Sequence, residues 1–199
     1  MPISEPNRIY QEIVDALIAM HRLTDGYTPG HEDRTADLCV KIGQRLELPP
    51  ERIEALHMAA QVHDIGKASI PLALLNKPGR ITDDEYAVLK THVQTGYDIV
   101  KKIGFPFNLA EIVGCHHEYL DGSGYPRGVG ADAIPLEARI LTVSDIVESI
   151  SADRPYRKSL GLAAALDEIR RLRGTRLDPE VVDACLDVVE RGLWHKDAA

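Results

Sequence analysis

The chain has 199 residues, of which 44% are hydrophobic and 27% charged, and this suits one soluble globular domain spanning residues 1–199. No apolar run is long enough to cross a bilayer and the N-terminus is too polar for a signal peptide, so we expect a cytoplasmic protein without a membrane contact. The formal net charge of -8 argues against binding to nucleic acid polymers, which need a basic surface, but it allows a small phosphorylated substrate.

Apolar residues recur at helical spacing from the start of the chain. The first three predicted helices lie within residues 7–23, 31–48 and 50–64. We expect the first of them, within about residues 1–25, to pack on the core. Pro50 sits at the first helical position of the third, and Gly66 stops it. His63 and Asp64 continue the inward face of this third helix, so both side chains point into the core.

Five further helices complete the prediction, within residues 82–100, 108–120, 135–150, 162–172 and 178–191. Thr82 begins a capping box with Glu85, Asn108 repeats that capping pattern, and Asp178 is a cap followed by a proline. The helix within 108–120 carries two adjacent histidines on its apolar stripe. Because no convincing strand pattern is present, the expected fold is an all-α bundle of about seven or more helices around a buried metal site.

Five of the eight histidines and two aspartates fall on inward faces: His31, His63, His92, His116, His117, Asp64 and Asp145. One inward histidine is easily a hydrogen-bonded core residue, but two buried aspartates among five imidazoles require positive charge, which metal ions supply. Seven ligands exceed what one tetrahedral zinc takes, so we expect two divalent ions bridged by Asp64. Iron or manganese suits this set, and zinc, nickel and cobalt stay open. Ions about 3.5–4 Å apart activate a bridging water, which predicts phosphate ester hydrolysis.

Two motifs carry a resemblance to a known family. They are HDIGK at residues 63–67 and HHEYLDGSGYP at residues 116–126. Both resemble the signatures of the HD-GYP subgroup of the HD-domain phosphohydrolase superfamily, and the similarity runs from about residue 27 to residue 192. Shorter stretches agree with it at residues 90–92, 134–139, 153–157 and 177–179. The resemblance implies a bacterial phosphodiesterase that linearises cyclic di-GMP to pGpG and, in some members, continues to GMP.

The resemblance also implies roles for single residues. One metal would be held by His31, His63, Asp64 and Asp145, and the other by Asp64, His92, His116 and His117. Lys67, beside the catalytic Asp64, would contact a substrate phosphate or the metal-bound hydroxide. Family members that bind a third metal have a glutamate four residues before the first ligand histidine. That position is Tyr27 here, so the centre is expected to be binuclear.

Arg154 and Arg157 resemble the family's phosphate-contacting basic pair, and a solvated basic turn is the alternative. The glycine-rich loop of residues 121–128 also has two interpretations. It either lets substrate, or a diguanylate cyclase (GGDEF) partner domain as described for the family, approach its backbone and Tyr125, or it turns the chain sharply with Tyr125 packed beneath. We expect Glu118 and Asp121 to accept hydrogen bonds from the ligand histidines and orient them.

Two departures from the family pattern leave alternatives open. Relatives commonly carry a sensory domain ahead of the catalytic helices, whereas only a short segment precedes His31 here, and Glu148 stands where many relatives have an aspartate. The alternatives are an HD phosphohydrolase for another nucleotide, a non-catalytic module that binds cyclic di-GMP or a partner, and a di-iron oxygen sensor. Association into a homodimer is a further open expectation.

Overall fold

The computed structural model describes residues 3–24, 30–153 and 158–195. Within these ranges the regular elements are all helical, which confirms the all-α prediction. The nine α-helices in the described ranges are α1 (Arg8–Thr24), α2 (His31–Arg45), α3 (Pro50–Val62), α4 (Leu72–Leu75), α5 (Asp83–Lys101), α6 (Leu109–Cys115), α7 (Leu136–Ser151), α8 (Leu162–Leu172) and α9 (Pro179–Glu190). Three short 3-10 helices join them: η1 (Glu5–Asn7), η2 (Ile65–Ser69) and η3 (Ala131–Ala133).

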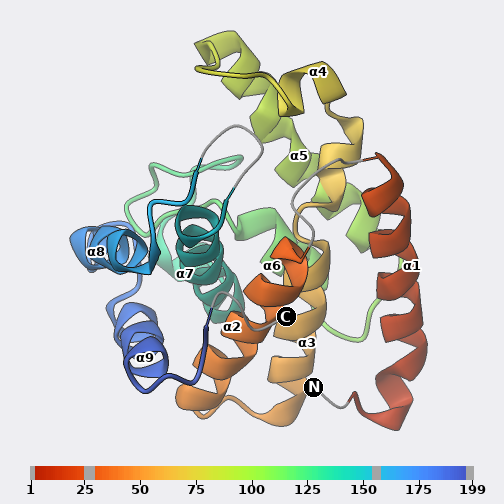
Figure 1. Cartoon of the computed structure of the whole chain (residues 1–199). Coiled ribbons are helices and arrows are strands. Elements are labelled where there is room, and N and C mark those ends of the chain that lie inside the picture. Colours follow the sequence, from red (N-terminus) through yellow and green to blue (C-terminus); the bar gives the residue numbers. More distant parts are fainter. Residues whose placement is uncertain (1–2, 25–29, 154–157, 196–199) are drawn as a thin grey trace.

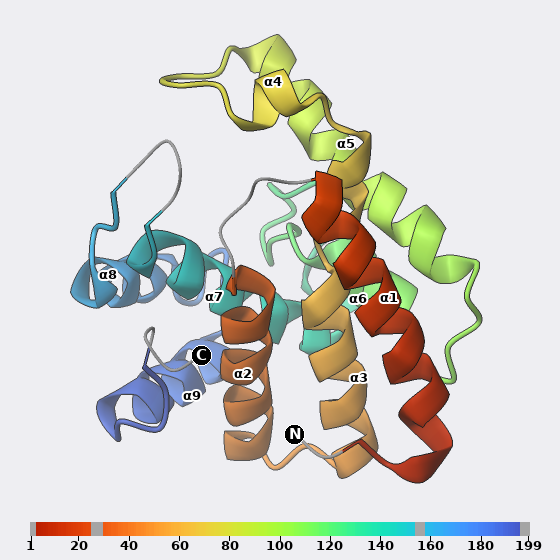
Figure 2. The same cartoon turned by 45° about the vertical axis from the view of Figure 1, so that its right-hand side comes forward.

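Helices α2, α3 and α7 form the centre of the bundle (Figure 1). Helix α2 packs against α3 on one side and against α7 on the other, α1 covers α3, and α8 and α9 pack against α7. Helix α5 lies against α6 and η2, while its first turns project with α4 away from the rest of the chain (Figure 2). No described helix combines the length and the apolar character needed to span a bilayer.

Side-chain capping bonds form at two of the three predicted helix starts. The backbone N–H of Glu85 donates to Thr82 Oγ1 and the backbone N–H of Thr82 donates to Glu85 Oε2, so the predicted capping box is confirmed. Asp178 accepts from the backbone N–H of Glu180 at the start of α9, as expected. Asn108 precedes α6 but makes no side-chain capping bond, so that part of the prediction is wrong.

Two predicted helices end earlier than the apolar pattern indicates. Helix α3 ends at Val62 and α6 at Cys115, so the motif residues 63–64 and 116–117 stand in the turns that follow. Gly66 allows the backbone of η2 to approach α5 closely, because a Cβ atom at this position would lie 1.9 Å from the carbonyl oxygen of His92. The backbone of η2 therefore packs directly against α5.

Large apolar side chains fill the space between the helices. The largest fully buried ones are Leu38, Ile42, Leu56, Met58, Leu109, Ile140, Leu141, Ile169 and Trp194. Burying such a side chain stabilises the fold by about 1.5–3 kcal/mol. Packing of the apolar faces therefore stabilises the helices more than helix propensity does. The indole Nε1 of Trp194 also donates to the carbonyl oxygen of Arg34 at 3.3 Å. The cysteines, Cys39, Cys115 and Cys185, are buried free thiols, as predicted.

Polar contacts attach the start of the chain to α3. The carboxylate of Glu54 is buried and accepts from the backbone N–H of Ser4 at 3.0 Å and from the Ser4 hydroxyl at 2.8 Å. The side-chain amide of Asn7 donates to the same carboxylate at 2.5 Å. Helix α1 itself contacts α3.

Candidate metal centre

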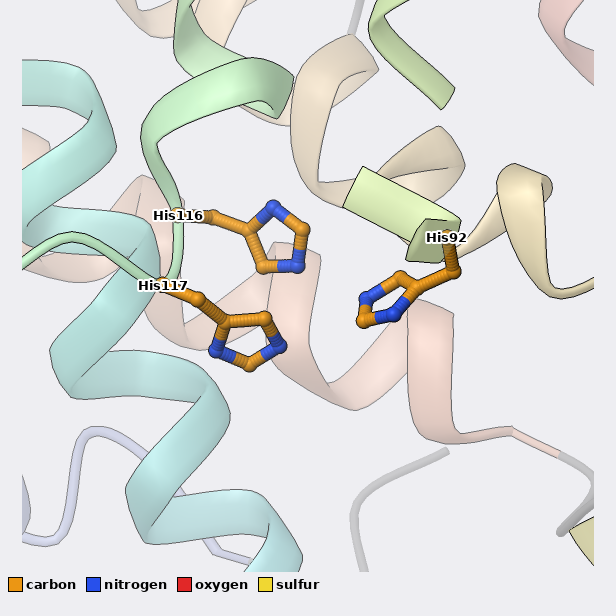
Figure 3. A group of neighbouring side chains, drawn as sticks. All are labelled: His92, His116 and His117. Atoms are coloured by element: carbon orange, nitrogen blue, oxygen red, sulfur yellow. The ribbon is translucent and has the colours of Figure 1, made fainter. Parts of the chain in front are cut away.

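The structure brings the seven sequence-predicted ligands together near the ends of several helices. His31 is the first residue of α2, Asp145 lies in the middle of α7, and His92 lies within α5. The other four stand in the turns after α3 and α6. Six of the seven fall into two groups whose ligand atoms lie within 4.8 Å of one another, namely His31, His63 and Asp145, and His92, His116 and His117. Figure 3 shows the second group with its three rings turned toward one another.

Asp64 lies between these two groups and offers one oxygen to each. Its Oδ2 atom is 3.4 Å from His63 Nε2 and 3.6 Å from His31 Nε2, whereas its Oδ1 atom is 3.5 Å from His92 Nε2. Asp145 contacts the first group, with Oδ1 3.5 Å from His31 Nε2 and 3.9 Å from His63 Nε2. Asp64 is therefore the carboxylate that contacts both groups.

Backbone carbonyl groups fix the orientation of three of the imidazole rings. In each ring Nδ1 lies within hydrogen-bond distance of the carbonyl oxygen three residues earlier. The pairs are His63 with Ala60 at 2.7 Å, His92 with Leu89 at 2.6 Å and His116 with Val113 at 2.5 Å. Because a carbonyl oxygen only accepts, Nδ1 carries the hydrogen, and in the neutral ring Nε2 presents its lone pair to the centre.

The Nε2 atoms of these three histidines are buried and have no hydrogen-bond partner among the described residues. Buried polar atoms without a partner are rare because leaving one unpaired costs about 1–3 kcal/mol. A divalent cation accepts the lone pairs of imidazole nitrogens and neutralises nearby carboxylates. The donor set and its orphaned nitrogens thus fit bound metal ions.

The two groups differ in charge. Burial disfavours a charged His63, but Asp64 and Asp145 outweigh burial and raise the pKa of His63 to about 9. Burial also opposes a charged Asp64, yet Lys67 and His63 hold the pKa of that carboxyl well below its usual range. Burial lowers the pKa of His117 to about 3. The first group thus attracts positive charge, while the second presents neutral imidazoles.

Glu148 orients the remaining histidine of the first group. Its Oε2 atom lies 2.5 Å from His31 Nδ1, and its Oε1 atom accepts from Arg34 Nε at 3.0 Å and from Arg34 Nη2 at 2.5 Å. The Glu148 side chain is fully buried, so this ion pair is shielded from water. Arg34 was missed from the sequence, although it lies three residues after His31 and therefore on the same side of α2.

Lys67 and Tyr125 lie beside the centre. Lys67 Nζ is 2.5 Å from Asp64 Oδ2, and the ring of Tyr125 stacks on that of His117 with 4.8 Å between ring centres. Both residues line a cleft of about 280 Å³ that His92 and His117 also line. Tyr86 lines the outer part of this cleft and was not singled out from the sequence, where no pattern marks it.

The glycine-rich loop after α6 is shaped by Glu118, and the expectation that Glu118 and Asp121 orient ligand histidines is wrong. Glu118 accepts from the backbone N–H groups of three loop residues, Arg127, Gly128 and Val129. Asp121 accepts from the backbone and the hydroxyl of Ser123 within the loop. A Cβ atom at Gly124 would lie 2.4–2.6 Å from backbone atoms of residues 117–119, so the loop folds tightly onto the histidine turn.

Three sequence-predicted residues lie outside the described ranges. They are Arg154 and Arg157, the expected phosphate-contacting pair, and Tyr27, which stands at the position of the third-metal glutamate. Their roles stay predictions.

Comparisons with known proteins place the chain in a family. The family model described as HD domain matches residues 13–181. The cyclic di-GMP phosphodiesterase response regulator RpfG of Xanthomonas campestris pv. campestris is 36% identical over 178 residues, which cover 88% of this chain and 47% of that protein. The 3'3'-cGAMP-specific phosphodiesterase 3 of Vibrio cholerae serotype O1 is 40% identical over 168 residues, covering 84% of this chain and 35% of that protein. The chain thus spans less than half the length of these two relatives.

A solved structure shares the fold. The cyclic GMP-AMP specific phosphodiesterase V-cGAP3 of V. cholerae superposes with a TM-score of 0.71 at 22% sequence identity, covering 94% of this chain and 51% of the other. At this identity the likeness bears on the arrangement of the helices alone.

Proposed function

This chain belongs to the HD-domain family, and we propose that it is an HD-GYP phosphodiesterase that hydrolyses cyclic di-GMP to linear pGpG. The position of Asp64, with one carboxylate oxygen toward each histidine group, is the observation that carries the proposal. The similarity to RpfG supports the substrate, and the GYP sequence at residues 124–126 supports the subgroup. Residues 1–199 would form one domain of this kind.

The two groups would hold two divalent ions, with iron or manganese the preferred metals for a mixed imidazole and carboxylate set. His31, His63 and Asp145 would hold one ion, and His92, His116 and His117 the other, with Asp64 shared between them. When bound, such ions supply Lewis acidity toward a phosphodiester and lower the pKa of a coordinated water. The orphaned Nε2 atoms and the ionised carboxylates of Asp64 and Asp145 support this assignment.

The chain's own residues would position the substrate. Lys67 Nζ stands beside Asp64 at the inner end of the cleft, where an ammonium group can bind a phosphate oxygen. Glu148 holds the ring of His31 in place through Nδ1. This contact supports a working centre rather than the non-catalytic alternative, since the longer acid still reaches its histidine.

A second candidate substrate is 3'3'-cGAMP. The relative named for it is 40% identical to this chain, slightly more than RpfG at 36%. The ligand residues would act on the phosphodiester, which both cyclic dinucleotides contain, so the centre itself fits both. The choice between them is therefore decided by assay.

The test is an anaerobic hydrolysis assay on the full chain loaded with Fe(II) or Mn(II). Cyclic di-GMP, 3'3'-cGAMP and cyclic di-AMP are supplied separately, products are separated by chromatography, and metal content is measured on the same sample. We expect pGpG from cyclic di-GMP and loss of both metal and activity in Asp64→Ala; the amount of GMP reports any second cleavage. A metal-loaded protein that leaves all three dinucleotides intact would refute the proposal.

Other expectations rest on the motif resemblance and the sequence. They are contact of the residue 121–128 loop with a GGDEF domain, a homodimer, and a cytoplasmic location. Copurification with a GGDEF domain and measurement of molecular mass in solution test the first two.

A further inference from the structure

The cleft beside the second histidine group runs outward along α5. Lys67 and His117 lie at its inner end, Tyr125 in the middle, and Leu75, Ile81 and Tyr86 line its outer part. Its volume is about 280 Å³, whereas pockets for whole drug-sized ligands measure roughly 300–1,000 Å³. The cleft is therefore suited to one part of a dinucleotide rather than to all of it.

An aromatic surface connects the two ends of the cleft. The rings of Tyr86 and Tyr125 meet edge to face with 6.1 Å between centres and an interplanar angle of 81°. Tyr125 in turn stacks on His117 with 4.8 Å between centres and an angle of 30°. Tyr86 is 45% exposed, which leaves part of its ring open to a ligand.

Positive charge lies beside this surface. Lys90 Nζ is 5.2 Å from the centre of the Tyr86 ring and 5.8 Å from that of Tyr125. Lys77 also lines the cleft, where Glu85 pairs with it at 2.7 Å. Aromatic rings with apolar neighbours accept a flat base by stacking, and lysines attract an anion. A ligand that satisfies both features is a nucleobase joined to a phosphate.

We propose that this cleft is the subsite for one nucleobase of the substrate, stacked on Tyr86, with the attached phosphodiester at Lys67. The inference rests on the proposed function for the identity of the dinucleotide and adds the residue that recognises its base. Stacking tolerates any base, so Tyr86 raises affinity for nucleotides as a class.

The test compares two probes that share a phosphate but differ in the base. GMP and ribose 5-phosphate are titrated into the full chain loaded with Mn(II), and both dissociation constants are measured by calorimetry. The variants are Tyr86→Ala, Tyr86→Phe, which keeps the ring, and Val88→Ala. Val88 is a matched control because it is 43% exposed on the same helix and lies outside the cleft. The ratio of the two constants isolates the base contact and is insensitive to the fraction of folded protein.

We expect the wild-type chain to bind GMP more tightly than ribose 5-phosphate, and Tyr86→Ala to reduce this preference at least about fivefold. Tyr86→Phe and Val88→Ala should keep it. Equal affinity for both probes in the wild type, or an unchanged preference in Tyr86→Ala, would overturn the subsite.

The failure of the subsite and the failure of the proposed function can be told apart. A Tyr86-dependent GMP preference in a chain that hydrolyses no cyclic dinucleotide leaves the subsite standing and removes the activity. Hydrolysis of a cyclic dinucleotide together with an unchanged preference for GMP in Tyr86→Ala supports the activity and removes the subsite.

Discussion

Glu148 and His31 stand 117 positions apart in the chain, yet Glu148 Oε2 lies 2.5 Å from His31 Nδ1. Arg34 holds the other oxygen of the same carboxylate. A ligand histidine whose Nδ1–H is bound by a carboxylate keeps its ring orientation and is a stronger donor through Nε2. Glu148 is thus a positioning residue for the first histidine group.

Glu148→Gln should weaken metal binding. The amide is neutral and has one accepting oxygen. Its NH₂ group cannot accept a hydrogen bond, so either His31 or Arg34 loses its acceptor. Loss of such a supporting partner typically costs about 10–100-fold in metal affinity. Mn(II) titration against a competing chelator measures the change, and circular dichroism checks the fold. Glu137→Gln is the matched control, because Glu137 lies on the same helix and pairs with Arg52 at 2.6 Å. Equal affinity in both variants would contradict the role of Glu148.

Substitution of the two aspartates should affect metal content differently. Asp64 offers an oxygen to both histidine groups, whereas the histidine nitrogens within 4 Å of Asp145 in the described ranges belong to His31 and His63. We expect Asp64→Ala to lose both ions and Asp145→Ala to retain the ion held by the other group. Elemental analysis of purified protein gives the number of ions per chain. Full metal content in Asp64→Ala would show that the carboxylate is not shared.

Gly66→Ala should destabilise the fold. The added methyl group would meet the backbone of α5, which cannot move away as a flexible side chain could. Forced overpacking of this kind costs typically about 1–3 kcal/mol. Urea denaturation measures the free energy of unfolding. The control is Gly130→Ala, because Gly130 has a φ of -89° and its nearest neighbour would be 3.4 Å away. Similar stability of the two variants would argue against a tight contact between η2 and α5.

The contact between Glu54 and the start of the chain should make stability depend on pH. Burial raises the pKa of Glu54, but the hydrogen bonds from Asn7 and Ser4 outweigh burial and hold this pKa below its ordinary value. Glu54 therefore contributes fully to the free energy of unfolding above about pH 4.3, the usual glutamate pKa. This contribution is lost as the pH falls through the lower pKa of Glu54 in the folded protein.

Thermal melting between pH 3 and pH 7 checks this sign. We expect the wild-type midpoint to fall on the acid side, and Glu54→Gln to show a shallower fall because it has no carboxylate to protonate. If the two curves run parallel, Glu54 does not contribute to acid sensitivity.

The clustering of seven histidine and aspartate side chains could be predicted from the sequence, because their burial and charge leave few arrangements. His63 and Asp64 follow an apolar stripe, and two buried aspartates demand cations whatever the details of the fold. The all-α class followed from the spacing of apolar residues in the same way. The structure brings these seven side chains together, while their binding of metal stays a proposal.

The helix ends and the supporting contacts could not be predicted in this way. Apolar periodicity continues past Cys115, but α6 ends there, and Glu118, three residues later, binds the backbone of the following loop. The pairing of Arg34 with Glu148 spans 114 positions, and no local pattern encodes it. Tyr86 likewise gains its neighbour Tyr125 only through the packing of α5 beside the loop.

Helix α5 carries residues of both the cleft and the second histidine group. Tyr86 and His92 are six residues apart, which corresponds to about 9 Å along the axis. A ligand that tilts α5 when it binds to Tyr86 also shifts the imidazole of His92. If such a ligand changes the affinity for a cation bound by His92, then the cation changes the affinity for the ligand by the same factor. Occupancy of the outer end and occupancy of the inner end would then be coupled, with a sign that binding measurements give.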